Sequence, residues 1–94
     1  MKLIIAIVQD DYITKVVKAL MDNKIRATKL SSTGGFLKSG NTTLFIGVED
    51  NEVEDVIDLI KKECATKKIK DGNTEITLGG ANLFVMDIDK YMKI

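Results

Sequence analysis

The sequence predicts an α+β fold in which an antiparallel sheet carries two helices on one of its faces. Short apolar or alternating runs, which are typical of strands, occur in four parts of the chain. Two further stretches repeat apolar residues at the spacing of one buried helix stripe. In chain order these segments are strand, helix, strand, strand, helix, strand, which is the βαββαβ order of a ferredoxin-like sandwich. With 94 residues, the chain fits a single domain, residues 1–94.

The first strand and helix are predicted from residues 3–22. Residues 3–8 form a continuous apolar run rich in β-branched side chains, which favours a strand covered on both faces and therefore central in its sheet. Asp10 or Asp11 is expected to cap the helix that follows. The predicted buried stripe of that helix consists of Ile13, Val16, Val17, Leu20 and Met21.

Residues 25–30 and 42–48 are predicted to pair as an antiparallel arm. The first segment alternates loosely and places Arg26, Thr28 and Leu30 on one face, as a strand requires. The second segment has an apolar centre. The polar side chains of this arm can therefore face a ligand together.

The second half of the chain is predicted to add a helix and the last strand. Asn51 and Glu54 are expected to form the capping box of the helix, and its predicted stripe consists of Val53, Val56, Ile57, Ile60 and Cys64. Residues 65–73 are a brief lysine-rich connection, and two strand segments, 74–78 and 81–86, are interrupted by Gly79-Gly80. Residues 87–94 are expected to form a short helical turn or a packed end. With both helices on one face, the other face of the sheet is left for partners to bury.

Composition excludes several classes of function. The net charge is zero, which argues against nonspecific nucleic-acid binding, and a single cysteine excludes an internal disulfide. There is no histidine, so no familiar zinc site and little support for catalysis. The longest apolar run has six residues, far short of the roughly 20 of a membrane-spanning helix. We therefore expect a cytoplasmic binding module that has no metal.

A local basic field marks the candidate site. Between Asn23 and Val48 there are four positive side chains and no negative one. Glycines at 34, 35 and 40 allow backbone N–H groups to converge on an oxyanion, although a flexible hairpin tip would have the same composition. Phe36 is suited to stacking on a base or to a contact with a neighbouring subunit, and Arg26 to binding a phosphate or to a solvated edge. Short donors and acceptors that could read a base edge are Thr28, Asn41 and Thr43.

Three motifs, Arg26-Ala27-Thr28-Lys29-Leu30, Thr33-Gly34-Gly35-Phe36-Leu37 and Gly40-Asn41-Thr42-Thr43, closely resemble the bacterial PII-like cyclic di-AMP receptors, the PstA or DarA family. The opening Met1-Lys2 with Ile4-Ile5-Ala6-Ile7-Val8-Gln9-Asp10, the Gly47-Val48 pair and Gly79-Gly80-Ala81 match as well. The resemblance implies a PII-like homotrimer that binds one cyclic di-AMP in each cleft between subunits. One departure is the connection over residues 65–73, which is shorter than in the family.

The resemblance also implies roles for individual residues. Gly35, Phe36 and Leu37 would meet phosphate and base, Arg26 and Thr28 would line the pocket, Asn41 would read an adenine, and Gly47, Gly79 and Gly80 would allow ligand and neighbouring subunit to come close. No cofactor is expected besides this ligand, and the downstream protein partner is unknown. The expected function is a non-enzymatic receptor whose 31–41 loop responds to cyclic di-AMP. The alternatives are a PII-type sensor of ATP or another metabolite, and a structural trimer or an enzyme on the same scaffold.

Overall fold

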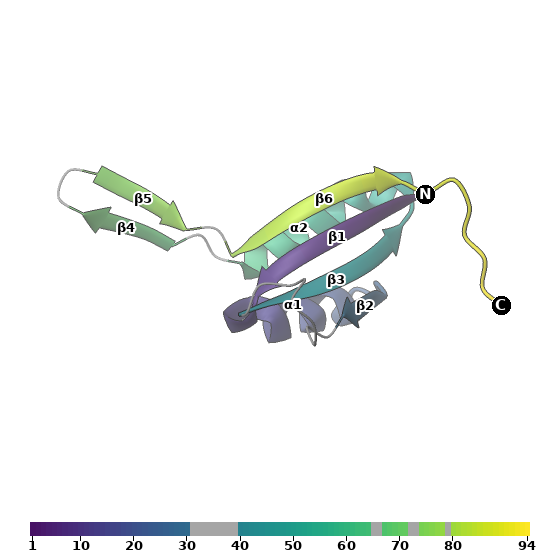
Figure 1. Ribbon diagram of the computed structural model, residues 1–94, viewed down its shortest axis with the longest axis horizontal. Helices are drawn as coiled ribbons and strands as arrows, with labels where there is room; N and C mark the ends of the chain where they lie inside the picture. Colours follow the sequence, from purple (N-terminus) through teal and green to yellow (C-terminus); the bar gives the residue numbers. More distant parts are fainter. Residues whose placement is uncertain (31–39, 65–66, 72–73, 79) are drawn as a thin grey trace.

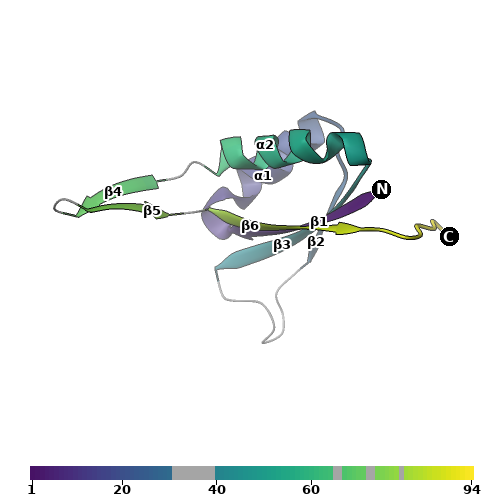
Figure 2. The ribbon, with the colours of Figure 1, turned by 90° about the horizontal axis from the view of Figure 1, so that it is seen from above.

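The computed structural model describes residues 1–30, 40–64 and 80–94 in full, and residues 67–71 and 74–78 by their backbone. Its main element is a four-stranded antiparallel sheet of order β2-β3-β1-β6. The strands are β1 (Lys2–Gln9), β2 (Ala27–Leu30), β3 (Asn41–Val48) and β6 (Ala81–Asp87). Both helices, α1 (Asp10–Asp22) and α2 (Val53–Glu63), cover the same face of the sheet, as Figure 2 shows. This is the ferredoxin-like arrangement that the order of elements predicts, and β1 is central as expected.

The core lies between the sheet and the two helices. Alternate residues of β1 point into it, and Ile4, Ala6 and Val8 are fully buried. The intervening residues Leu3, Ile5 and Ile7 lie on the opposite face and are only half-buried. Burying an aliphatic side chain stabilises a fold by about 1.5–3 kcal/mol. The prediction that β1 is covered on both faces therefore holds for one face of this single chain only.

Helix α1 begins at Asp10, so neither Asp10 nor Asp11 stands before the helix as a cap. Asp10 is the first helical residue, and the N-cap position is taken by Gln9, which makes no side-chain capping hydrogen bond. The expected Asp10 or Asp11 cap is therefore wrong. Of the predicted stripe, Ile13, Val16 and Leu20 are buried, whereas Met21 is 69% exposed.

Helix α2 is preceded by a short 3-10 turn, η1 (Asp50–Glu52). The capping box uses Glu49 and Glu52, with the Glu49 N–H donating to Glu52 Oε1 at 3.3 Å, and not the expected Asn51 and Glu54. The predicted stripe is confirmed: its buried members are Val56, Ile60 and Cys64.

The connection between α2 and β6 contains a hairpin that the sequence did not predict. Strands β4 (Lys67–Asp71) and β5 (Thr74–Leu78) pair with each other in a separate two-stranded sheet. Figure 1 shows this hairpin projecting from the body of the protein. Residues 74–78 therefore do not begin the last strand of the main sheet, which consists of β6 alone.

The segment after β6 also differs from expectation. Residues 88–94 contain no regular secondary structure and lead away from the sheet (Figure 1). Three of their apolar side chains are largely exposed, Tyr91 by 65%, Met92 by 62% and Ile94 by 111%. The predicted helical turn or packed end is wrong for this chain taken alone. In the described parts of the chain, no helix is long and apolar enough to cross a lipid bilayer.

Candidate ligand-binding site

The β2 edge of the sheet presents the basic part of the candidate site. Arg26 precedes β2 and is exposed, and Thr28 lies within β2 and is exposed as well. Neither Arg26 nor its neighbours Lys24 and Lys29 forms a salt bridge with any acid in the described residues. Their charge is therefore available to an anion.

An aromatic row crosses the open face of the sheet beside Thr28. The register pairs Thr28 with Phe45, Phe45 with Ile5, and Ile5 with Phe84. Residues directly opposite one another on antiparallel strands share a face, with Cβ atoms about 4.5–5.5 Å apart. Phe45 is 39% exposed and Phe84 54% exposed, so a flat ligand could stack against this row. Neither phenylalanine was among the predicted site residues, although alternation along β3 puts Phe45 on the same face as Thr43.

The neighbouring row of paired residues on this face contains Thr43, two residues from Phe45 along β3. Thr43 pairs with Leu30 on one side and Ile7 on the other, and it is only 4% exposed. Its Oγ1 accepts and donates no hydrogen bond within the described residues. A buried polar group left unpaired costs about 1–3 kcal/mol. This hydroxyl is suited to binding a polar group that the described residues do not supply.

Short backbone and side-chain contacts fix the start of β3. The Asp10 N–H donates to Gly40 O at 2.9 Å, and the Thr42 hydroxyl donates to Asp10 Oδ1 at 2.8 Å. Gly40 has φ +92°, a conformation in which a side chain would be strained. Asn41, the first residue of β3, is half-buried and lies opposite Gln9. The position of Asn41 is therefore set by the junction between β1 and α1.

The predicted site residues Thr28 and Asn41 lie at two different positions along the strand direction of the sheet. Thr28 lies opposite Phe45, and Asn41 is four residues from Phe45 along β3, a separation of about 13 Å at 3.3 Å per residue. Gly47, on the far side of Phe45, is exposed opposite Leu3. A ligand that contacts both Thr28 and Asn41 must therefore be an extended molecule and not a simple oxyanion.

Close packing within its own chain requires glycine at position 80. A Cβ at this position would lie 2.9 Å from Cys64 Cβ and 2.9 Å from Tyr12 Cδ2, closer than real contacts allow. At Gly47, by contrast, a Cβ would meet only Met1 Cε at an ordinary 3.5 Å. Four other predicted site residues, Gly35, Phe36, Leu37 and Gly79, lie outside the described residues.

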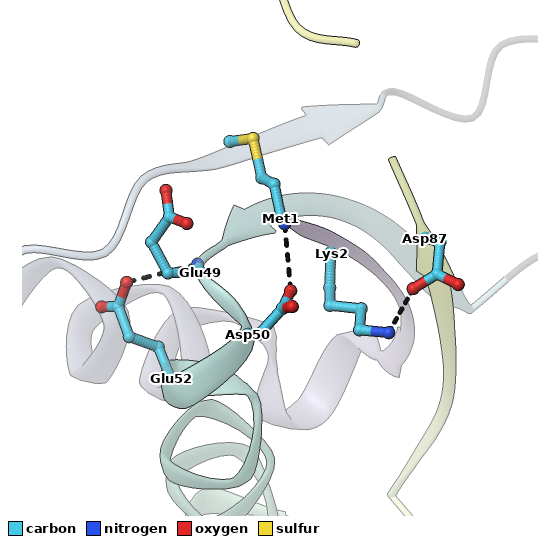
Figure 3. A network of polar contacts seen from close by, with 6 residues as sticks. All are labelled: Met1, Lys2, Glu49, Asp50, Glu52 and Asp87. Atoms are coloured by element: carbon cyan, nitrogen blue, oxygen red, sulfur yellow. Dashed lines mark hydrogen bonds and ion pairs between the residues drawn. The ribbon is translucent and has the colours of Figure 1, made fainter. Parts of the chain in front are cut away.

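A polar network closes the end of the sheet where β1 begins (Figure 3). The N-terminal ammonium of Met1 lies 3.0 Å from Asp50 Oδ1, and the Lys2 ammonium donates to Asp87. The hydrogen bond from the N-terminal ammonium lowers the pKa of Asp50, and the hydrogen bond to Asp87 raises the pKa of Lys2. Because each charge in these two pairs is matched within the chain, we assign the network a structural role.

Known proteins resemble this chain over most of its length. The family model described as "Cyclic-di-AMP receptor" matches residues 1–71. A "Nitrogen fixation nifHD region GlnB-like protein 1" from Methanothermococcus thermolithotrophicus is 38% identical over 85 residues, 77% of this chain and 81% of the relative. A crystal structure of "a functionally unknown protein from Pediococcus pentosaceus ATCC 25745" has 41% identity and a TM-score of 0.78, covering 99% of this chain and 96% of that one.

The family match ends at Asp71, the last residue of β4, so β5 and β6 lie beyond it. It includes the β2 edge, the aromatic residue Phe45 and all of β3. The GlnB-like name of the relative agrees with the PII-like arrangement of sheet and helices. The chain belongs to the cyclic-di-AMP receptor family.

Proposed function

We propose that this protein is a non-enzymatic cytoplasmic receptor that binds cyclic di-AMP in the clefts between subunits of a homotrimer. Residues 31–41 respond to the ligand, and the changed surface signals to a protein partner. Family membership supports a receptor of this nucleotide. The observation that carries the proposal is the arrangement at the β2 edge, where basic residues that form no salt bridge in the described part of the chain adjoin an exposed aromatic row.

The chemistry of the ligand fits this arrangement. Cyclic di-AMP has two phosphates and two bases, so it needs cationic or N–H donors and flat apolar surfaces in one site. Arg26 supplies a planar fork for a phosphate, and Phe45 lies beside Thr28 as a surface for a base. The separation of about 13 Å between the levels of Thr28 and Asn41 suits a ligand with two bases.

The open face of the sheet supports self-association. Large apolar side chains exposed on this face include Phe45, Phe84 and Met86, which is 51% exposed. Monomeric proteins rarely leave a contiguous apolar patch of this kind uncovered. A trimer in which the sheets face one another would bury it, and would bring residues of adjacent subunits to the same cleft.

The single thiol gives no support to a catalytic alternative. Cys64 is 6% exposed, and burial raises the pKa of its thiol above the ordinary value of 9.0, which disfavours the reactive thiolate. In the described residues, no cluster of three or more acidic, cysteine or histidine side chains could hold a metal ion.

Isothermal titration calorimetry tests the proposal, with cyclic di-AMP, ATP and cyclic di-GMP each added to protein at about 0.1 mM, on the order of a weak ligand's dissociation constant. We expect heat with cyclic di-AMP and little with the other two. Arg26→Ala and Phe36→Ala should each weaken binding by about 1–3 kcal/mol, or about 5- to 150-fold. Lys61→Ala, which removes an exposed charge on α2, is the matched control and should bind normally.

Three outcomes would contradict the proposal. Absence of heat with cyclic di-AMP would exclude this nucleotide as the ligand. A preference for ATP would favour a PII-type metabolite sensor, as the name of the GlnB-like relative suggests. A monomeric mass in sedimentation equilibrium, with and without ligand, would exclude the trimer.

A further inference from the structure

A groove runs between the two helices, on the side of the helical layer that faces away from the sheet. Figure 2 shows α1 and α2 together on one face of the sheet. Two hollows of about 440 and 290 Å³ lie between them, and both are lined by Asn23, Leu59 and Lys62, so they form one continuous groove. Ala19 and Leu59 are half-buried and give the groove an apolar floor. A trimer that buries the open face of the sheet leaves this groove exposed.

The two helices that form the groove are antiparallel. β1 and β2 both pair antiparallel with β3, so they run in the same direction, and α1 between them must run the opposite way. β3 and β6 likewise both pair antiparallel with β1, and α2 returns the chain from the end of β3 to Cys64, which lies against Gly80 at the start of β6. The N-terminal half of α1 therefore lies beside the C-terminal half of α2.

The groove is basic at this end. Lys15 and Lys18 of α1 and Lys62 of α2 line it, and all three are exposed. Glu63, which is half-buried, is the acid that lies among them. Lys18 and Lys62 each have an acid four residues away on their own helix, which is the spacing of an ion pair, but in the described part of the chain neither forms a salt bridge. The positive charge at this end is therefore available to another molecule.

The groove is acidic at its other end. Asp55 and Asp58 of α2 line it, together with Asn23, which directly follows Asp22 at the end of α1. The last turn of α1 has no basic residue, so the Asp22 carboxylate lies at the negative end of the helix dipole, where it lowers helix stability. None of these three carboxylates forms a salt bridge within the described residues. Charges placed against local stability are typical of functional surfaces.

Charge and shape together identify the occupant of the groove. We propose that it binds an α-helix of a protein partner, with acidic side chains on one half of the contact face and basic side chains on the other. Acids over Lys15 and Lys18 and bases over Asp55 and Asp58 would match the groove at both ends. A helix itself favours this order of charges, because acids stabilise its N-terminal end and bases its C-terminal end. Apolar side chains of the partner helix would rest on the apolar floor, as in other helix-in-groove contacts.

The groove is long enough for such a contact. Lys15 and Asp22 of α1 are seven positions apart, about 10 Å at 1.5 Å per residue, and Asp55 and Lys62 of α2 are separated by the same length. A partner helix would therefore contact the groove over about two turns. A small contact area with exposed charges predicts a weak complex that is sensitive to salt. Weak binding of this kind suits a signalling contact that forms and dissociates.

Fluorescence anisotropy with a labelled synthetic helix tests the groove. The probe is an alanine-rich peptide of about 18 residues, because isolated helices shorter than about 12–15 residues are marginal in water. It carries glutamates on one face of its N-terminal half and lysines on the same face of its C-terminal half. The control peptide has the same composition, with glutamate and lysine alternating along that face. At about 0.1 M salt, where the Debye length is about 10 Å, we expect the probe to bind at least about fivefold more tightly than the control peptide.

Two matched variants of the protein locate the contact. Lys18→Glu reverses a charge inside the groove and should weaken binding of the probe by about fivefold or more, since it turns an attraction into a repulsion. Lys61→Glu makes the same change at an exposed lysine of α2 that lies outside the two hollows, and it should change the affinity for the probe by less than about twofold. Circular dichroism of both variants checks that the helices remain folded.

Two results of these titrations overturn the inference: a probe that binds no more tightly than the control peptide, or two variants that weaken binding equally. Sedimentation velocity of the protein alone tests another occupant. Trimers that associate further at low salt, and lose this association in Lys18→Glu, would assign the groove to a second copy of the chain and overturn the partner helix.

The inference rests on the proposed function for the existence of a protein partner, and it gives that partner a docking surface. No residue that lines the two hollows is among the predicted ligand-binding residues. A protein that binds cyclic di-AMP but does not discriminate between the peptides therefore loses only the groove. A protein that binds the probe as expected but gives no heat with cyclic di-AMP loses only the proposed ligand.

Discussion

Replacing Gly80 with alanine tests the close packing where the hairpin returns to the sheet. The added Cβ would lie 2.9 Å from Cys64 Cβ and 2.9 and 3.0 Å from two atoms of the Tyr12 ring. Cys64 Cβ is fixed to the backbone and cannot swing away. Overpacking of this kind costs about 1–3 kcal/mol, while alanine recovers about 0.4–1 kcal/mol by restricting the unfolded chain. We expect a net loss of about 1–2 kcal/mol.

Gly47→Ala is the matched control, since its Cβ would make only an ordinary contact with Met1. Urea unfolding followed by circular dichroism, at one fixed protein concentration because the chain is expected to associate, gives both free energies. A loss of 1–2 kcal/mol corresponds to a melting temperature lower by about 4–16 °C for a domain of this size. The packing argument is refuted if Gly80→Ala is as stable as the parent, or if Gly47→Ala loses as much.

Three further predictions follow from single side chains. Asp50 has a pKa below its ordinary value of 3.8, so its pairing with the N-terminal ammonium stabilises the fold above that pH. This stabilisation is lost as the pH falls through the folded-state pKa of Asp50. The Asp50→Asn variant should therefore lose less stability than the parent on acidification, as measured by urea unfolding at a series of acidic pH values. Thr43→Val removes the buried hydroxyl, which has no hydrogen-bond partner among the described residues, and should raise the unfolding free energy of the ligand-free protein by about 1 kcal/mol while weakening cyclic di-AMP binding. Unchanged affinity would show that the hydroxyl does not bind the ligand. The Cys64 thiol, whose pKa burial raises, should react with Ellman's reagent at pH 8 only as fast as the chain unfolds, and rapid labelling of the folded protein would contradict its buried position.

The fold could be predicted from the sequence because its strongest signals are local. The apolar run of residues 3–8 is long enough to specify a strand, and β1 is central in the sheet. The helix stripes at Val16 and Val56 are buried as the 3.6-residue period requires. The order of these elements then determines the sheet topology.

The features that the sequence did not predict are those for which two local patterns fit equally well or no local pattern is present. Asn51/Glu54 and Glu49/Glu52 have the same spacing, and only the tight η1 turn selects the second pair. The β4 strand was missed because Lys67 to Asp71 is mostly charged and has no apolar alternation, and its pairing depends on β5 alone. For the site, Phe45 was placed in the apolar centre of a strand, because a sequence does not show that one face of the sheet is left open.

The contact between Gly80 and Cys64 means that the chain leaves the helical layer and returns to the sheet at nearly the same point. The connection between Cys64 and Gly80 therefore begins and ends at nearly the same place, and its length can change without moving either of these two residues. Insertions or deletions there would not alter strand register in the main sheet, since β4 and β5 pair only with each other. We therefore expect chains with a longer or shorter connection between Cys64 and Gly80 to keep the same main sheet.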